Sequence, residues 1–155
     1  MSTHRIGLIS DTHGLLRPEV TRALAGVEHI IHAGDVGDPN ILTKLEDIAP
    51  VTAVRGNVDF TTQFSNLPIN NTLEIGQVSI YVTHIIQSLD IDPKAGGFQA
   101  VIFGHSHRPE VKEKNGVFYI NPGSIGPRRF NLPISMAYLH INGTQLRVEP
   151  IEFNQ

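Results

Sequence analysis

The chain has 155 residues, of which 40% are apolar and 17% are charged, and its formal net charge is −3 with histidine neutral. This composition is typical of a globular domain with a hydrophobic core and excludes an intrinsically disordered chain. The acidic balance gives no strong nucleic-acid signal, and the apolar runs are too short to cross a bilayer, so we expect no membrane partner. The opening residues, MSTHRIGLIS, carry no export signal, and we expect a cytoplasmic protein.

The first third of the chain alternates apolar runs with amphipathic helical patterns. The elements expected here are strands at 5–10, 28–33 and 51–55 and helices at 17–26 and 40–48. Pro18 and Pro39 suit the first turns of these helices, and Gly26 suits a helix terminator. The order β-α-β-α-β predicts a parallel sheet with right-handed crossovers.

The second half changes to a hairpin pattern. We expect strand pairs at 71–75 and 78–84, at 110–114 and 117–120, and at 135–141 and 145–153, with a strand at 100–103 and a helix at about 92–98. Asn115-Gly116 and Asn142-Gly143 are strong hairpin turns. We therefore predict an α/β fold in which two sheets form a β sandwich flanked by helices, a four-layer α/β/β/α arrangement. No repeat or linker divides the chain, so residues 1–155 are expected to form one domain.

Polar side chains follow every predicted strand that would end at the ligand-binding edge of an open α/β sheet. They are Asp11 and His13 after the first strand, Asp35 after the second, Asn57 after the third, His84 after strand 78–83, and His105 and His107 after strand 100–103. In extended geometry residues two apart point the same way, so His105 and His107 can reach one centre or two adjacent ones. A lone Asp at such a position is usually a turn or a helix cap. The convergence of all five strand ends indicates a site instead.

Metal chemistry follows from the types of ligand. There is no cysteine, so any transition metal must be held by imidazole nitrogen and carboxylate or amide oxygen, which suit manganese first, and also iron, zinc, nickel or cobalt. Seven ligands are too many for one open catalytic metal and suit two divalent ions that share a carboxylate. Two ions about 3.5–4 Å apart can hold a hydroxide and bind phosphate oxygens. The pattern predicts a hydrolase of phosphate esters.

At this point the sequence resembles the calcineurin-like metallophosphoesterases. The resemblance rests on Asp11-x-His13, Gly34-Asp35-x-x-Asp38, Gly56-Asn57-x-Asp59, His84 and Gly104-His105-x-His107. The short length, the Gly-Asn-x-Asp form and the loop Asn121-Pro122-Gly123-Ser124 are similar to the small single-domain phosphodiesterase branch. That branch also includes a retromer subunit that keeps the fold but acts as a protein scaffold.

The resemblance also implies roles for residues. One ion would be held by Asp11, His13, Asp35 and His107, and the other by Asp35, Asn57, His84 and His105. Asp35 would bridge the two ions, and a bridging hydroxide would attack phosphorus in line with the leaving group, with Asp35, Asn57 and His84 at the catalytic centre. Asn57 and Arg128 are the expected contacts to substrate phosphate.

The chain departs from its relatives at two positions. Val58 stands where many protein phosphatases of the family have a histidine that is implicated in protonating the leaving group. Valine cannot donate a proton, which favours a diester or an activated ester over a phosphoprotein. Ile85 follows His84 where glycine is usual, which puts a β-branched side chain beside the second ion.

Several polar residues near these motifs have structural interpretations. Asp38 and Asp59 are expected to cap helices and loops or to orient ligands. His32, in an apolar run, is expected to pack against the core or behind the site.

Three functions remain open from the sequence. The first is a phosphodiesterase acting on a small phosphate ester or a nucleotide-like substrate. The second is a scaffold of the retromer-subunit type with a vestigial metal site. The third is a metal-binding regulatory protein, which would need a closed site without an open water position. Homo-oligomer formation is compatible with each.

Overall fold

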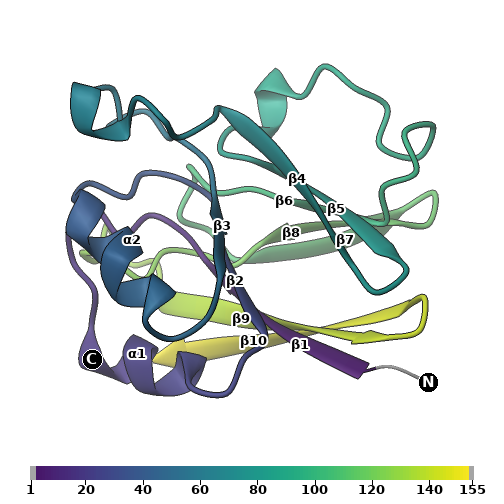
Figure 1. Cartoon of the computed structure of the whole chain (residues 1–155), viewed down its shortest axis with the longest axis horizontal. Helices are drawn as coiled ribbons and strands as arrows, with labels where there is room; N and C mark the ends of the chain where they lie inside the picture. Colours follow the sequence, from purple (N-terminus) through teal and green to yellow (C-terminus); the bar gives the residue numbers. More distant parts are fainter. Residues whose placement is uncertain (1–2, 154–155) are drawn as a thin grey trace.

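The computed structural model describes residues 3–153 and consists of two five-stranded sheets packed face to face (Figure 1). The first sheet has the order β10-β9-β1-β2-β3. Its strands are β1 (Thr3–Ile9), β2 (His29–His32), β3 (Val51–Ala53), β9 (Ile134–Asn142) and β10 (Gln145–Phe153). Strands β1, β2 and β3 are parallel, whereas β9 is antiparallel to β1 and to β10. The predicted parallel β-α-β-α-β unit is confirmed.

The second sheet has the order β4-β5-β6-β8-β7. Its strands are β4 (Asn70–Ile75), β5 (Val78–Thr83), β6 (Ala100–Ile102), β7 (Glu110–Lys114) and β8 (Val117–Asn121). Strands β5, β6 and β8 are parallel, and the edge strands β4 and β7 form hairpins with them. At the Asn115-Gly116 turn both residues have positive φ, +55° and +81°, as a type I′ hairpin requires.

Apolar side chains that alternate along the strands fill the space between the sheets. Ile6 and Leu8 of β1 face Ile80 and Val82 of β5 and Ile102 of β6 in one buried cluster. Residues of β9 complete the cluster, since Leu139 and Ile141 are also buried in it. The period of two along each strand is what turns these residues inward, and it confirms the predicted sandwich.

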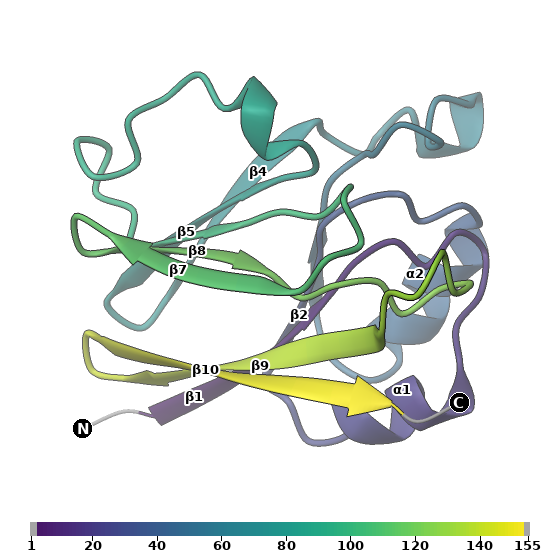
Figure 2. The ribbon, with the colours of Figure 1, turned by 180° about the vertical axis from the view of Figure 1, so that it is seen from behind.

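Two helices cover the outer face of the first sheet, α1 (Pro18–Leu24) and α2 (Pro39–Glu46) (Figures 1 and 2). Val20 and Leu24 of α1 and Ile41 and Leu45 of α2 are buried there together with Ile9 and Ile30. Gly7 permits the close approach of α1, because a Cβ at that position would overlap the Leu24 side chain. Asp38 caps α2 by accepting a hydrogen bond from the Asn40 backbone N–H at 3.0 Å.

The outer face of the second sheet carries a thinner layer. Tyr81, Val101 and Val117 are covered there by Ile86 and Leu89 and by Phe98, all from the connection between β5 and β6. This connection contains a 3-10 turn at Ile86–Ser88 and further turns at 93–97. The helix predicted at 92–98 is therefore wrong. Pro93 can begin a helix but Gly97 adopts φ +83°, which ends it after a single turn.

Within residues 3–153 no helix is both long enough and apolar enough to cross a membrane.

Candidate metal centre

Six of the seven predicted ligands gather in two groups at one edge of the sandwich, where the carboxyl ends of β1, β2, β5 and β6 meet. The first group is Asp11, His13 and His107, and the second is Asp35, His84 and His105. In each group one ligand atom per residue lies within 4.8 Å of the others. Asp11, Asp35, His84 and His107 are buried, whereas His13 is half-buried and His105 is exposed.

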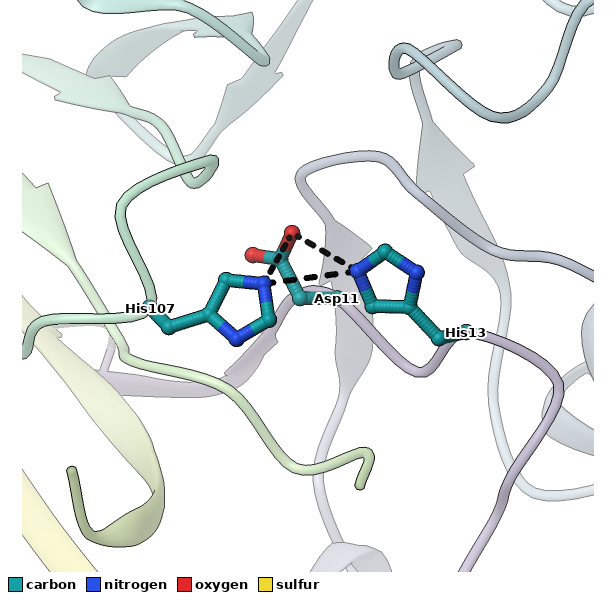
Figure 3. Close-up of side chains that lie close together, drawn as sticks. All are labelled: Asp11, His13 and His107. Atoms are coloured by element: carbon teal, nitrogen blue, oxygen red, sulfur yellow. Dashed lines mark hydrogen bonds and ion pairs between the residues drawn. The ribbon is translucent and has the colours of Figure 1, made fainter. Parts of the chain in front are cut away.

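The first group points three donor atoms at one spot (Figure 3). Asp11 Oδ1 lies 3.4 Å from His107 Nε2 and 3.7 Å from His13 Nε2. The two Nε2 atoms are 3.3 Å apart. A cation between the three atoms could be coordinated by both imidazole nitrogens and by the carboxylate oxygen.

The second group joins the first through Asp35. Its Oδ2 atom lies 3.1 Å from His84 Nε2 and 3.5 Å from His13 Nε2, so one carboxylate oxygen faces both groups. His84 Nε2 also lies 3.9 Å from Asp11 Oδ1. The rings of His84 and His105 stack edge to face with centroids 5.3 Å apart. The two groups therefore form one continuous cluster.

The Asp11 carboxylate is held by one oxygen and leaves the other for the cluster. Its Oδ2 accepts hydrogen bonds from the Ser10 hydroxyl at 2.6 Å and from the His105 backbone N–H at 3.3 Å. Its Oδ1 is buried and has no hydrogen-bond partner. A buried carboxylate oxygen without a donor is costly, and a bound cation removes that cost.

Asp35 and His84 are oriented in the same way. Asp35 Oδ1 accepts from the Val58 backbone N–H at 3.0 Å, which leaves Oδ2 for the cluster. His84 Nδ1 donates to the Ala33 carbonyl at 2.7 Å, so the neutral ring presents the lone pair of Nε2. That Nε2 is also buried and without a hydrogen-bond partner. Val58 thus serves the site through its backbone.

The charges of the cluster are tightly coupled. Burial raises the pKa of Asp11, but the nearby imidazoles of His107 and His13 and the Ser10 hydroxyl outweigh it and hold the pKa below its usual range. The pKa of Asp35 is lowered as well, because His84 and the Val58 N–H outweigh the effect of burial. Burial lowers the pKa of His84, yet Asp35 and Asp11 more than compensate and raise it. The two carboxylates therefore stabilise positive charge beside them, either on protonated imidazole rings or on bound metal ions.

The backbone at the ligands is unusual. Seven non-glycine residues of the described chain have positive φ, and five of them are candidate ligands. These are Asp11 (φ +58°), His13 (+46°), Asp35 (+58°), His105 (+76°) and His107 (+65°). The extended geometry expected for 105 and 107 is wrong, and the left-handed conformation sends His105 to the second group and His107 to the first. Strained backbone of this kind concentrates at functional sites.

Two glycines let the loops approach closely. A Cβ at Gly104 would overlap the Ser10 hydroxyl, and a Cβ at Gly56 would overlap the Asp35 carboxylate. The motif glycines therefore make room for the two aspartates.

The Asp59 carboxylate fastens the loops together. It is fully buried and accepts three backbone hydrogen bonds, from Val36 N–H at 2.9 Å and from Gly37 and Gly56 N–H at 3.0 Å each. The loop that presents Asp35 is thereby tied to the loop that presents Asn57.

His32 lies behind the cluster, as expected. It is fully buried, and its Nδ1 accepts from the Gly34 N–H at 3.1 Å, so its Nε2 donates to the Thr12 hydroxyl at 3.0 Å. That hydroxyl in turn donates to the Val36 carbonyl at 2.7 Å. This neutral chain of hydrogen bonds links the loops after β1 and β2, and burial lowers the pKa of His32 to about 4.

The loop Asn121-Pro122-Gly123-Ser124 supports the site from the second sheet. The Asn121 amide donates to the Gly104 carbonyl and to the Ser106 hydroxyl, each at 3.1 Å. The Ser124 hydroxyl donates to the Asp11 carbonyl at 3.1 Å. These contacts hold the ligand loops after β1 and β6 against each other.

The remaining predicted residues lie at the rim. Asn57 is exposed and lines a cleft of about 340 Å³ together with His84 and Ile85. Ile85 therefore forms part of the cleft wall. Arg128 is exposed, and no hydrogen bond or ion pair joins its side chain to any residue between 3 and 153. Arg128 is not among the described residues that line this cleft.

The residues present fit metal ions. The cluster offers imidazole nitrogen and carboxylate oxygen, two of its inward-facing atoms are buried without hydrogen-bond partners, and the open cleft reaches His84. A structural metal site would be closed on all sides, whereas this one keeps an opening.

Comparison with known proteins identifies the family. Residues 5–144 match the calcineurin-like phosphoesterase superfamily domain. The chain belongs to this superfamily. It is 38% identical to a probable metallophosphoesterase of Methanothermobacter thermautotrophicus, over 94% of this chain and 91% of the relative. It is 29% identical to a phosphodiesterase of Methanocaldococcus jannaschii, over 77% of this chain and 82% of the relative.

A solved structure extends the comparison to the fold. Vacuolar protein sorting 29 from Cryptosporidium parvum superposes with a TM-score of 0.78 at 21% identity and covers 99% of both chains. At this identity the similarity concerns the fold. The chain is thus a calcineurin-like phosphoesterase superfamily member with the sandwich of that superfamily.

Replacing Asp59 by Asn should destabilise the domain by about 2–3 kcal/mol, because the amide keeps one acceptor and turns its NH₂ toward backbone donors. Asp38→Asn is the matched control, since it removes the same charge and asparagine caps a helix equally well. Urea unfolding measures both. Equal stabilities of the two variants would contradict the role given to Asp59.

His32 should make the metal-free protein acid-sensitive. Its pKa is about 4 in the folded state against 6.5 as the ordinary value, so the folded state prefers the neutral ring. The resulting stability is complete above pH 6.5 and is lost as pH falls toward 4, by up to about 3 kcal/mol. Urea unfolding from pH 7 to 4.5 in chelator should show a smaller loss for His32→Gln than for the native chain. Parallel pH profiles would refute this.

Proposed function

We propose that this protein is a phosphodiesterase that uses two divalent metal ions to hydrolyse a small phosphate ester or a nucleotide-like substrate. The observation that carries the proposal is the position of Asp35 Oδ2, 3.1 Å from His84 Nε2 and 3.5 Å from His13 Nε2. One carboxylate oxygen that faces two ligand groups is what a shared ligand requires. The relatives named as metallophosphoesterase and phosphodiesterase support the same reaction class.

The proposed ligands divide as the two groups do. One ion is assigned to Asp11, His13, Asp35 and His107. The other is assigned to Asp35, His84 and His105, which form the second group, and to Asn57, which lines the cleft beside His84 and is the proposed fourth ligand. Manganese is the first choice of metal, and iron, zinc, nickel and cobalt suit the same nitrogen and oxygen donors.

When bound, a pair of such ions supplies a hydroxide nucleophile near neutral pH and positive charge for the phosphate oxygens. The chain's own contribution is orientation. The Val58 N–H and the Ala33 carbonyl fix Asp35 and His84, and the Ser10 hydroxyl fixes Asp11. Asn57 is placed to contact substrate, because it lines the cleft beside His84. Arg128 is a proposed contact from the exposed loop that follows Ser124.

The preference for diesters rests on Val58. Its side chain is 38% exposed at the position where a proton donor would stand, and it has no proton to give. An ester with an acidic leaving group needs no such donor. A p-nitrophenyl diester is therefore a suitable first substrate.

A scaffold function is the second candidate, because vacuolar protein sorting 29 has the same fold. A vestigial site would have lost ligands, whereas all seven positions here carry metal-binding side chains. Three of the exposed apolar residues, Val58, Phe60 and Ile69, lie beside Asn57 in sequence or on the cleft. Apolar residues in this position suit contacts to a substrate at the edge of the cleft better than a protein-docking surface far from the site. We further propose that the phosphodiesterase is a single-domain cytoplasmic protein that can form a homo-oligomer.

The test combines metal stoichiometry with turnover. Purified protein dialysed against manganese should bind about two ions per chain and hydrolyse bis-p-nitrophenyl phosphate faster than p-nitrophenyl phosphate. Asp35→Asn should bind fewer than one ion and lose at least about 100-fold in kcat, because it weakens both sites together. Asp38→Asn, which removes the same charge at a helix cap, is the control. Full turnover by Asp35→Asn, or no turnover by the native protein with any of the five metals, would refute the proposal.

A further inference from the structure

We propose that Arg55 forms an anion-binding subsite next to the metal centre, which recognises a second anionic group on the substrate, a phosphate or a carboxylate. The proposal rests on the phosphodiesterase function proposed above and narrows its substrate class. Arg55 directly precedes the Gly56-Asn57-x-Asp59 motif and is not one of the site residues predicted from the sequence.

The backbone places Arg55 at the carboxyl end of β3. It lies two residues past that strand and two residues before Asn57, and its N–H donates to the Pro68 carbonyl at 2.7 Å. The preceding residue, Val54, is fully buried in the core between the sheets. Arg55 therefore has a fixed backbone at the seam where the edge strands β3 and β4 of the two sheets meet.

The cleft at this seam adjoins the metal centre. It has a volume of about 340 Å³, and His84 and Asn57 form one part of its wall. Arg55 lines the same cleft, which is completed by Ile69, Asn70, Thr83, Ile85 and Ser88. A group bound by Arg55 would thus be part of the molecule whose phosphate reaches the metal ions.

The Arg55 side chain is unpaired. Among residues 3–153 it makes no hydrogen bond and no ion pair, and its Nε is buried without a partner. Arg17 shows the contrasting structural use of this side chain, since it donates to the Ile125 carbonyl at 3.2 Å and to the Gly126 carbonyl at 3.0 Å. A buried N–H without an acceptor is unfavourable, so an acceptor supplied by a ligand is the natural complement.

The chemistry of the cleft selects an anion attached to an organic group. None of the described residues that line it is acidic, so nothing neutralises the guanidinium. Asn57, Asn70 and Ser88 offer neutral hydrogen-bonding groups, and Ile69 and Ile85 offer apolar surface. A planar guanidinium binds carboxylate and phosphate oxygens in pairs, which gives both affinity and direction.

The experiment uses three matched chromogenic diesters that all release p-nitrophenolate. They are p-nitrophenyl phenyl phosphate, its 3-carboxyphenyl analogue and its 3-phosphonophenyl analogue. The manganese-loaded native protein should have a kcat/KM for at least one charged analogue about tenfold above that for the phenyl ester, mostly through KM. The two charged analogues distinguish a carboxylate partner from a phosphate partner.

Arg55→Met should abolish that preference, and Arg55→Lys should restore part of it. Methionine keeps the length of the aliphatic stem, and circular dichroism checks that the variant folds. Arg147→Met is the matched control, because it removes the same charge from an exposed arginine that lines a different groove. The control should keep the native preference.

A binding measurement decides the matter independently of turnover. Calorimetric titration of the manganese-loaded protein should show that Arg55→Met weakens methylenediphosphonate about tenfold more than methylphosphonate, which lacks the second anion. Equal losses for both probes, or native discrimination among the three esters in Arg55→Met, would overturn the subsite. If no ester is hydrolysed, the proposed reaction fails, and the titration alone upholds or overturns the role of Arg55.

Discussion

Two buried carboxylates without a lysine or arginine partner are the constraint on which the rest of this structure depends. Asp11 is fully buried and Asp35 is nearly so, and among residues 3–153 the ion-pair partners of these two carboxylates are the imidazoles of His13, His84 and His107. Burying such charge is unfavourable unless positive charge accompanies it. The lowered pKa values of both aspartates and the raised pKa of His84 have the same cause, the attraction between the buried carboxylates and nearby positive charge. Metal ions supply that positive charge without the loss of the carboxylate charge.

The loops are built to hold this charge in place. Asp59 binds three backbone N–H groups from two loops, and His32 bridges the loops after β1 and β2 through Thr12. These buried hydrogen bonds stabilise the left-handed backbone at the ligands, which by itself would be unfavourable. Each loop starts from a strand whose inward side chains are locked in the core between the sheets. The sandwich therefore provides the rigidity, and the loops provide the chemistry.

Much of this could be predicted from the sequence. The period of two in the strands and the polar residue after each strand were sufficient to place Asp11, Asp35, His84, His105 and His107 at one edge. The strand pattern left open whether His105 and His107 share one group, and only the family resemblance assigned them to different ions. Their separation depends on positive φ at both residues, which non-glycine residues rarely adopt.

Two further features depend on tertiary contacts. The segment 92–98 has apolar residues but forms turns, since Phe98 packs over Tyr81 while Gly97 ends the helical turn. Arg55 stands out only when the cleft and its lack of acidic residues are seen. A local stretch of sequence cannot show which side chains will lack a hydrogen-bond partner in the folded protein. Arg55 was therefore not among the site residues predicted from the sequence.

The most direct test of the central claim is an anomalous difference map from crystals grown with manganese. If Asp35 is shared by two ions, the map should contain two peaks about 3.5–4 Å apart, with the Asp35 carboxylate between them, His13 and His107 beside one peak, and His84 and His105 beside the other. A single peak, or two peaks that do not share Asp35, would contradict the central claim.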